Sequence, residues 1–173
     1  MTRPMLSRRV TIATVCAALL LGVFPLSSGA QKKSRAKLRV CGNPNVKCPS
    51  PATSEPYDLQ FTVPRNSVIY DTELFYAVML KSVSSPTDDC DTFIPETERL
   101  AAQKLFPTNK VFTSRCSMPG YTSYSNTSPN AQFMAVYAGR TQAEADRMLA
   151  TVKATGKFPG ASVRRMRAMM NGT

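Results

Sequence analysis

The spacing of hydrophobic positions changes twice between residues 133 and 166, from that of a strand to that of a helix and back again. The apolar run FMAVYAG is followed by the amphipathic segment TQAEADRMLATVKATG and then by a short run that ends in ASVRRM. Thr141 and Glu144 have the spacing of a capping box, which predicts where the helix begins. Four apolar residues then recur at helical spacing, namely Ala145, Met148, Leu149 and Val152. The pattern predicts a complete strand, helix and strand unit.

An earlier part of the chain repeats this order. Residues 75–85 read as an apolar strand, residues 95–106 as a helix and residues 110–115 as another strand. Glu96 and Glu98 in the first helical turn favour the helix dipole. Two such halves predict an α+β fold of βαββαβ order, with a four-stranded antiparallel sheet and both helices on one face. We therefore expect the second face to be open, and an open face can serve as a binding surface.

Strand alternation divides the apolar residues of this sheet between its two faces. In the first strand, one face receives Tyr76, Val78 and Leu80, and the other receives Phe75, Ala77, Met79 and Lys81. In the later strand, Met134 and Val136 oppose Phe133, Ala135 and Tyr137. One set faces the helices and the other faces the open side.

The first thirty residues have the pattern of a signal peptide. Arg3, Arg8 and Arg9 precede an apolar run over residues 10–26, and small residues lead up to Ala30. We expect cleavage after Ala30, which places the mature chain in the periplasm or outside the cell. An uncleaved membrane anchor is the alternative.

A basic and proline-rich stretch, residues 31–58, follows the leader. Its basic residues are Lys32, Lys33, Arg35, Lys37, Arg39 and Lys47, whereas acidic and basic residues balance over residues 40–163 although the whole chain carries +11. We predict that this stretch is a linker and that residues 59–173 form the domain, with an edge strand or lead-in over residues 57–63. The most basic part of this stretch, residues 31–39, can make a peripheral contact with an anionic membrane, or it is simply solvated. Export and the balanced body argue against a nucleic-acid partner.

Four cysteines remain after the leader: Cys41, Cys48, Cys90 and Cys116. An even number in an exported chain predicts two disulfides. Three pairings are possible, and we favour Cys41 with Cys48 and Cys90 with Cys116, because the second pair lies at one edge of a crossover. The chain has no histidine and no paired CxxC spacing, so neither a metal nor a cofactor is expected.

A polar connection over residues 117–130, SMPGYTSYSNTSPN, is long for a link between two strands. Loops of this kind are often functional, and a surface insertion is the alternative.

The segments YAVMLKSVSS and AVYAGRTQAEADRMLATVKATGKFPGASVRRM resemble the sporulation-related repeat (SPOR) domain. Halves of that domain typically start as YxVQLGSF and end with a helix of the AEAxxLxxxLKAxG kind. The resemblance covers residues 75–166. It implies a ferredoxin-like fold and a cell-envelope module that binds peptidoglycan glycan strands lacking stem peptides on the sheet face away from the helices.

Combined with alternation, the resemblance predicts a glycan site on the open face. Its residues are Phe75, Ala77, Met79, Lys81, Phe133, Ala135, Tyr137, Arg164 and Arg165. Phe133 and Tyr137 would form an aromatic platform for sugar rings. Lys81 and one of the two arginines would meet muramic carboxylates.

Two other functions compete with glycan binding. One is an exported structural or protein-interaction domain with the same fold, whose partners would be cell-division or envelope proteins. The other is an enzyme, which we do not expect, because the chain has neither a histidine nor a nucleophile elbow. The acidic cluster of Asp88, Asp89 and Asp91 precedes a helix, where capping explains it.

Overall fold

The structure is a computed structural model, and it describes residues 37–52, 55–65, 69–85, 91–115 and 122–171. These residues belong to one compact unit, Arg35–Thr173. The predicted leader, Cys90 and Cys116 lie outside the described residues. No helix in the described part of the chain is long and apolar enough to cross a membrane.

The predicted α+β architecture is present, built on a four-stranded antiparallel sheet. Its strands, in spatial order, are β3 (Val111–Thr113), β5 (Ala131–Gly139), β2 (Phe75–Ser84) and β6 (Ser162–Met166). Helix α1 (Glu96–Leu105) follows β2, and helix α2 (Gln142–Ala154) follows β5. Sequence periodicity therefore predicted the type and order of these six elements.

Local interactions fix both helices. Thr141 Oγ1 accepts a hydrogen bond from Glu144 N, and Glu144 Oε2 accepts one from Thr141 N, so the predicted capping box is confirmed. The Thr141 hydroxyl and the backbone N–H groups of Thr141 and Arg140 donate hydrogen bonds to the Glu144 carboxylate, and these three bonds lower its pKa. In α1, the Arg99 guanidinium binds the Glu96 carboxylate and donates to the Val111 carbonyl at 2.9 Å, which ties the helix to β3.

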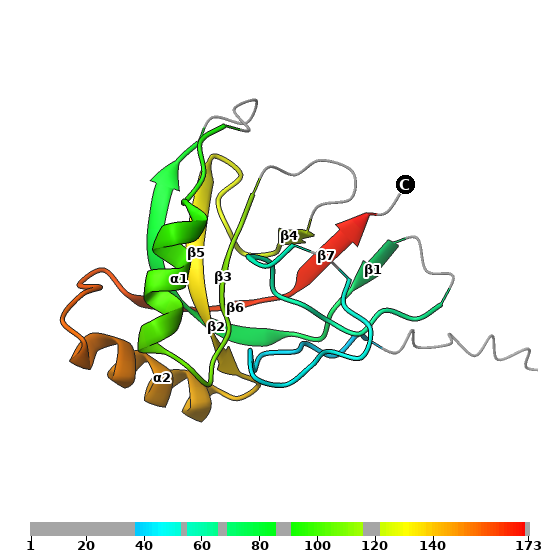
Figure 1. The fold of residues 1–173 in the computed structure, drawn as a ribbon, viewed down its shortest axis with the longest axis horizontal. Helices are drawn as coiled ribbons and strands as arrows, with labels where there is room; N and C mark the ends of the chain where they lie inside the picture. The colour runs from blue at the N-terminus through cyan, green and yellow to red at the C-terminus, as the bar shows by residue number, and fades with distance from the viewer. Residues whose placement is uncertain (1–36, 53–54, 66–68, 86–90, 116–121, 172–173) are drawn as a thin grey trace, which may run out of the picture. The chain divides into compact units, whose positions relative to one another are not determined.

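A second antiparallel sheet, which the sequence pattern did not predict, lies on the side of the four-stranded sheet that faces away from the helices. It has three short strands in the order β1 (Ile69–Asp71), β7 (Ala168–Asn171) and β4 (Thr122–Tyr124). Figure 1 shows β7 continuing from β6 to pair with β1 and β4, away from the two helices.

Apolar side chains pack on both faces of the four-stranded sheet. We call the group under the helices the helix-side core; it includes Val78, Leu80, Ala102, Val111, Met134, Val136, Ala145, Met148 and Val152. We call the group on the other face the second core; it includes Leu38, Val40, Leu59, Phe61, Phe75, Ala77, Phe112, Tyr124, Phe133, Ala135, Met166 and Ala168.

The prediction of an open second face is therefore wrong. Residues 37–52 and 55–63 cross this face together with the three-stranded sheet, and Leu59 and Phe61 are fully buried on it. The burial of Phe75, Ala77 and Ala135 is also complete. An apolar sheet face is stabilised by burial, and here another part of the same chain provides that burial.

The described part of the predicted linker belongs to the folded unit. Leu38, Val40 and Tyr57 are buried, and Val40 pairs with Phe61 in an isolated bridge. Over residues 57–63, where the sequence predicted either an edge strand or a lead-in, only Phe61 and Thr62 form isolated bridges and there is no continuous ladder. A boundary at residue 59 would cut through the second core.

The structure contains the predicted Cys41–Cys48 disulfide. Its loop contacts the residue that precedes β3, since Lys110 N donates to the Gly42 carbonyl at 2.8 Å. The Cys90–Cys116 pairing stays a prediction, although described neighbours of the two cysteines are in contact: the Arg115 guanidinium lies 4.2 Å from the centre of the Phe93 ring.

Candidate functional site

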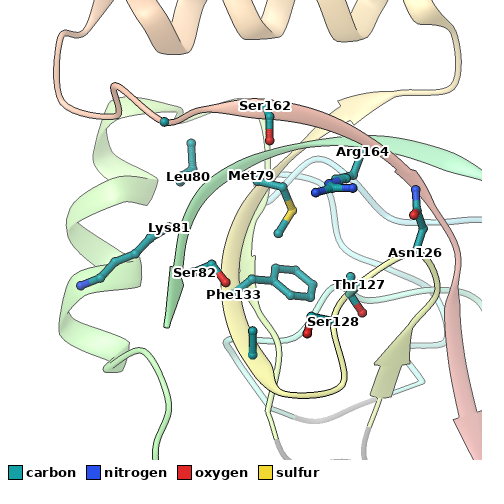
Figure 2. A pocket seen from close by; sticks show the side chains of 12 residues that line it. Met79, Leu80, Lys81, Ser82, Asn126, Thr127, Ser128, Phe133, Ser162 and Arg164 are labelled. Carbon is teal, nitrogen blue, oxygen red and sulfur yellow. The ribbon is translucent and has the colours of Figure 1, made fainter. Parts of the chain in front are cut away.

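A pocket of about 570 Å³ lies where β2, β5 and β6 meet the loop that follows β4. Its lining includes Met79, Ser82, Asn126, Ser128, Phe133 and Arg164. Figure 2 shows Met79, Phe133 and Arg164 from three different strands gathered beside Thr127 and Ser128. This is the part of the second face that residues 37–52 and 55–63 leave accessible.

Hydrogen bonds hold the loop wall of this pocket against β6. Asn126 has a left-handed backbone with φ of 59°, which asparagine tolerates better than most residues, and its Nδ2 donates to the Arg165 carbonyl at 3.2 Å. Ser125 N donates to the Arg167 carbonyl, and Arg167 N donates back to Ser125 Oγ. The polar side chains of residues 126–128 are therefore held beside the sheet edge.

The structure separates the two candidate arginines of β6. Arg164 pairs with Ala77, on the second-core side, and its side chain lines the pocket. Arg165 pairs with Tyr76, and its guanidinium lies 5.8 Å from the centre of that ring, on the helix side. Among the described residues, no ion pair involves Arg164.

Lys81 does not lie on the predicted face. The pairing of β2 with β5 shifts between Met79 and Lys81, so that Met79 pairs with Ala135 and Lys81 with Met134, a residue of the helix-side core. A β-bulge of this kind reverses the alternation of every later residue. Lys81 consequently forms an ion pair with Glu98 of α1 at 2.9 Å, and Figure 2 shows its side chain pointing away from Met79 and Phe133.

The predicted aromatic platform is absent. Phe133 is only 2% exposed, with ring centres 6.0 Å from Phe112 and 5.3 Å from Tyr124. Tyr137 is half-buried beside Phe75 and lines a separate, smaller hollow with Glu144. Burial raises the pKa of the Tyr137 hydroxyl, with the Arg140 charge acting in the opposite direction. Phe133 therefore contributes to the apolar floor of the pocket rather than to a broad stacking surface.

Of the nine predicted residues, the structure brings Met79, Phe133 and Arg164 together in the pocket, with Lys81 at its border. Phe75, Ala77 and Ala135 belong to the second core, and Tyr137 packs against that core beside Phe75. Arg165 lies on the helix side, beside Tyr76. The sequence analysis missed five polar lining residues: Ser82, Asn126, Thr127, Ser128 and Ser162. Three of them belong to the long polar connection, whose length was the only signal for them.

The lining combines polar side chains with an apolar floor. Among the described residues that line the pocket, none is a carboxylate, so the lining supplies no acid and base pair for hydrolysis. Within the described ranges, no cluster of side chains has the composition of a metal site. Hydroxyl groups, an amide, one guanidinium and an apolar floor can hold a polar, anionic ligand.

Gly42 places the disulfide loop against the ring of Tyr137, and this contact leads to a stability prediction. A Cβ atom on Gly42 would lie 2.2 Å from Tyr137 Cδ1 and 2.3 Å from Cε1. We expect Gly42→Ala to lower the free energy of unfolding by about 1–3 kcal/mol, as overpacking substitutions do. In a Tyr137→Ala background, Gly42→Ala should lower the free energy of unfolding by much less, as measured by urea unfolding. Equal costs in both backgrounds would show that the ring is not the obstacle.

Compared with known proteins, the chain matches no family model, no curated protein and no solved structure. The resemblance to the SPOR domain therefore rests on the sequence motifs alone.

Proposed function

We propose that this chain is a non-catalytic cell-envelope module that binds an acidic glycan strand in the pocket between β2, β6 and residues 126–128. The glycan we favour is peptidoglycan without stem peptides. The observation that carries the proposal is the exposed Arg164 side chain beside Met79 and Phe133, opposite a loop of hydroxyl and amide groups.

The scaffold we propose is a divergent ferredoxin-like, SPOR-like domain with an added cover. The order β3, β5, β2, β6 and the βαββαβ sequence of elements are compatible with it. Tyr76, Val78 and Leu80, which match the conserved pattern of the family's first strand, pack in or against the helix-side core as the resemblance implies. The added cover, which consists of residues 37–52 and 55–63 and the three-stranded sheet, leaves only a short length of the second face for a ligand.

The chemistry of the lining supports a sugar chain with carboxylates. Ser82, Ser128 and Ser162 offer hydroxyl groups that both donate and accept hydrogen bonds, as sugar hydroxyls require. Arg164 offers a guanidinium for a lactyl carboxylate. The apolar atoms of Met79, which is only partly buried, can contact the ring face of one sugar, and this limits the site to a short stretch of glycan.

The location we propose is the periplasm or the outside of the cell. The Cys41–Cys48 disulfide fits an exported protein, since such bonds persist in oxidising compartments. The leader motif and the SPOR resemblance narrow this to a bacterial cell envelope, with peptidoglycan and envelope proteins as the proposed partners.

The covered second face favours one other candidate, an exported structural or protein-interaction domain. A long glycan strand running along the whole sheet, as in the family the motifs resemble, would need Phe75, Ala77 and Ala135 at the surface, and all three are buried. A partner protein would need no such track.

A matched pair of arginine variants tests the glycan proposal. Arg164→Gln should weaken binding to amidase-stripped sacculi about tenfold, because a hydrogen bond to a charged group is typically worth about 1.5 kcal/mol or more. Arg165→Gln, one residue away on the helix side, should bind as the unaltered chain does. Binding is measured by co-sedimentation with intact and stripped sacculi.

Both outcomes of this assay are informative. Equal losses for the two variants, recovered at low salt, would indicate nonspecific charge attraction rather than a site. If the unaltered chain ignores stripped sacculi altogether, the glycan proposal fails and the protein-interaction candidate replaces it.

A further inference from the structure

The smaller hollow beside Glu144 lies between the end of β5 and helix α2, and it shares no described lining residue with the candidate pocket. Its volume is about 290 Å³, just below the range of sites that hold drug-sized ligands, so an occupant has to be a small molecule. Residues from both elements line it, among them Tyr137, Ala138, Gly139, Glu144, Arg147 and Met148.

The Glu144 carboxylate is held in a fixed position at this hollow. Its Oε2 atom accepts hydrogen bonds from the backbone N–H groups of Arg140 and Thr141 and from the Thr141 hydroxyl, each at 2.8 Å. A Cβ atom on Gly139, whose φ is 112°, would lie 2.6 Å from the same oxygen, so a side chain at this position would displace the carboxylate. Within the described residues, no hydrogen bond is donated to Oε1 of Glu144, and this oxygen can accept from a ligand.

Arg147 brings the opposite charge to the same hollow. Residues three apart on a helix lie on one face, with Cβ atoms about 5–6 Å apart, and both Glu144 and Arg147 line the space. In the described part of the chain, no ion pair joins the exposed Arg147 guanidinium to Glu144 or to any other carboxylate. The hollow therefore presents a carboxylate and a guanidinium that do not neutralise each other by direct contact.

We propose that this hollow binds a small free α-amino acid in its zwitterionic form. The ammonium group of the ligand donates a hydrogen bond to Glu144 Oε1, and its carboxylate accepts hydrogen bonds from the Arg147 guanidinium. The side chain of the ligand contacts Ala138 and Met148, which are buried apolar residues of the lining, so a short apolar side chain such as that of alanine suits the space. This site is independent of the proposed glycan site.

The test is titration of the folded chain with L-alanine and with D-alanine, followed by nuclear magnetic resonance of the backbone amides. At least one of the two should give saturable shifts at millimolar concentrations. N-acetylalanine lacks the ammonium group and alaninamide lacks the carboxylate, and each should bind about tenfold more weakly than alanine, because it loses a hydrogen bond between charged groups.

Variants of α2 locate the binding. Glu144→Gln removes the charge and keeps the capping box, since glutamine also serves at this position, and Arg147→Gln removes the guanidinium. Each should weaken alanine binding about tenfold. Asp146→Asn and Lys153→Gln are matched controls, because they remove charges from the same helix outside the lining of the hollow, and both should bind alanine as the unaltered chain does.

Three results would overturn the proposal. The first is the absence of saturable shifts with both alanines up to about 50 mM. The second is unchanged alanine binding in Arg147→Gln. The third is binding of N-acetylalanine or alaninamide as strong as that of alanine, which would show that the ligand needs only one of its two charges. The comparison of ligands uses the unaltered chain, so it holds even if a variant fails to fold.

Discussion

A chain that begins at Leu59 should be largely unfolded in buffer without denaturant. A chain that begins at Arg35 should be folded in the same buffer and should unfold cooperatively when denaturant is added. The shorter chain lacks Leu38 and Val40, which are 7% and 8% exposed on the second core, and it also lacks the Cys41–Cys48 disulfide. Burying each of these side chains is worth about 1.5–3 kcal/mol, and a short disulfide loop adds about 2–3 kcal/mol. These losses are comparable with the total stability of a typical domain, about 5–15 kcal/mol.

The measurement is denaturant unfolding followed by circular dichroism, with chains starting at Arg35 and Leu59 compared at equal concentration. The first should retain the stability of the full-length chain, because the compact unit begins at Arg35. If the chain starting at Leu59 is just as stable, residues 37–58 are a linker after all and the second core does not depend on them.

Phe133→Ala should lower the free energy of unfolding by about 3–5 kcal/mol, the usual cost of truncating a buried aromatic residue. Its ring is 2% exposed and lies edge-to-face with Phe112 and Tyr124, so the truncation removes several contacts and leaves a cavity. Tyr137→Ala should cost less, because that side chain is only half-buried. Urea unfolding of both variants provides the comparison.

Arg164→Gln is the control for this series, because an exposed polar substitution usually changes stability by no more than about 0.5 kcal/mol. Arg164 lines the same pocket as Phe133. Its replacement by Gln should leave the free energy of unfolding unchanged and should weaken binding to sacculi. A small stability loss for Phe133→Ala, with loss of sacculus binding, would instead support the open aromatic face expected from strand alternation.

Features that depend on neighbours in the sequence were predictable from it. The capping box of Thr141 and Glu144 needs only four consecutive residues, and the alternation of Tyr76 and Val78 follows from strand geometry. The Cys41–Cys48 bond closes a loop of a few residues, so it needed no knowledge of the fold. The α+β architecture and the order of its main elements followed from such local patterns.

The location of the candidate site depended on contacts between distant parts of the chain. A single bulge near Leu80 sends Lys81 toward Glu98, and nothing in the local pattern of β2 marks that bulge. The strands β1, β4 and β7 have three or four residues each, too few for a recognisable period, and both β1 and β4 pair with β7, which is distant from them in the sequence.

The composition of β2 and β5 established that both faces of this sheet would be apolar, whereas the tertiary structure decided what covers the second one. Leu59 and Phe61 alternate as a strand facing a core would, but alternation does not identify the core they face. Burial is favourable against any apolar surface, so only the folded chain shows that these residues cover Phe75 and Ala135. The pocket beside Arg164 is the space which that covering leaves.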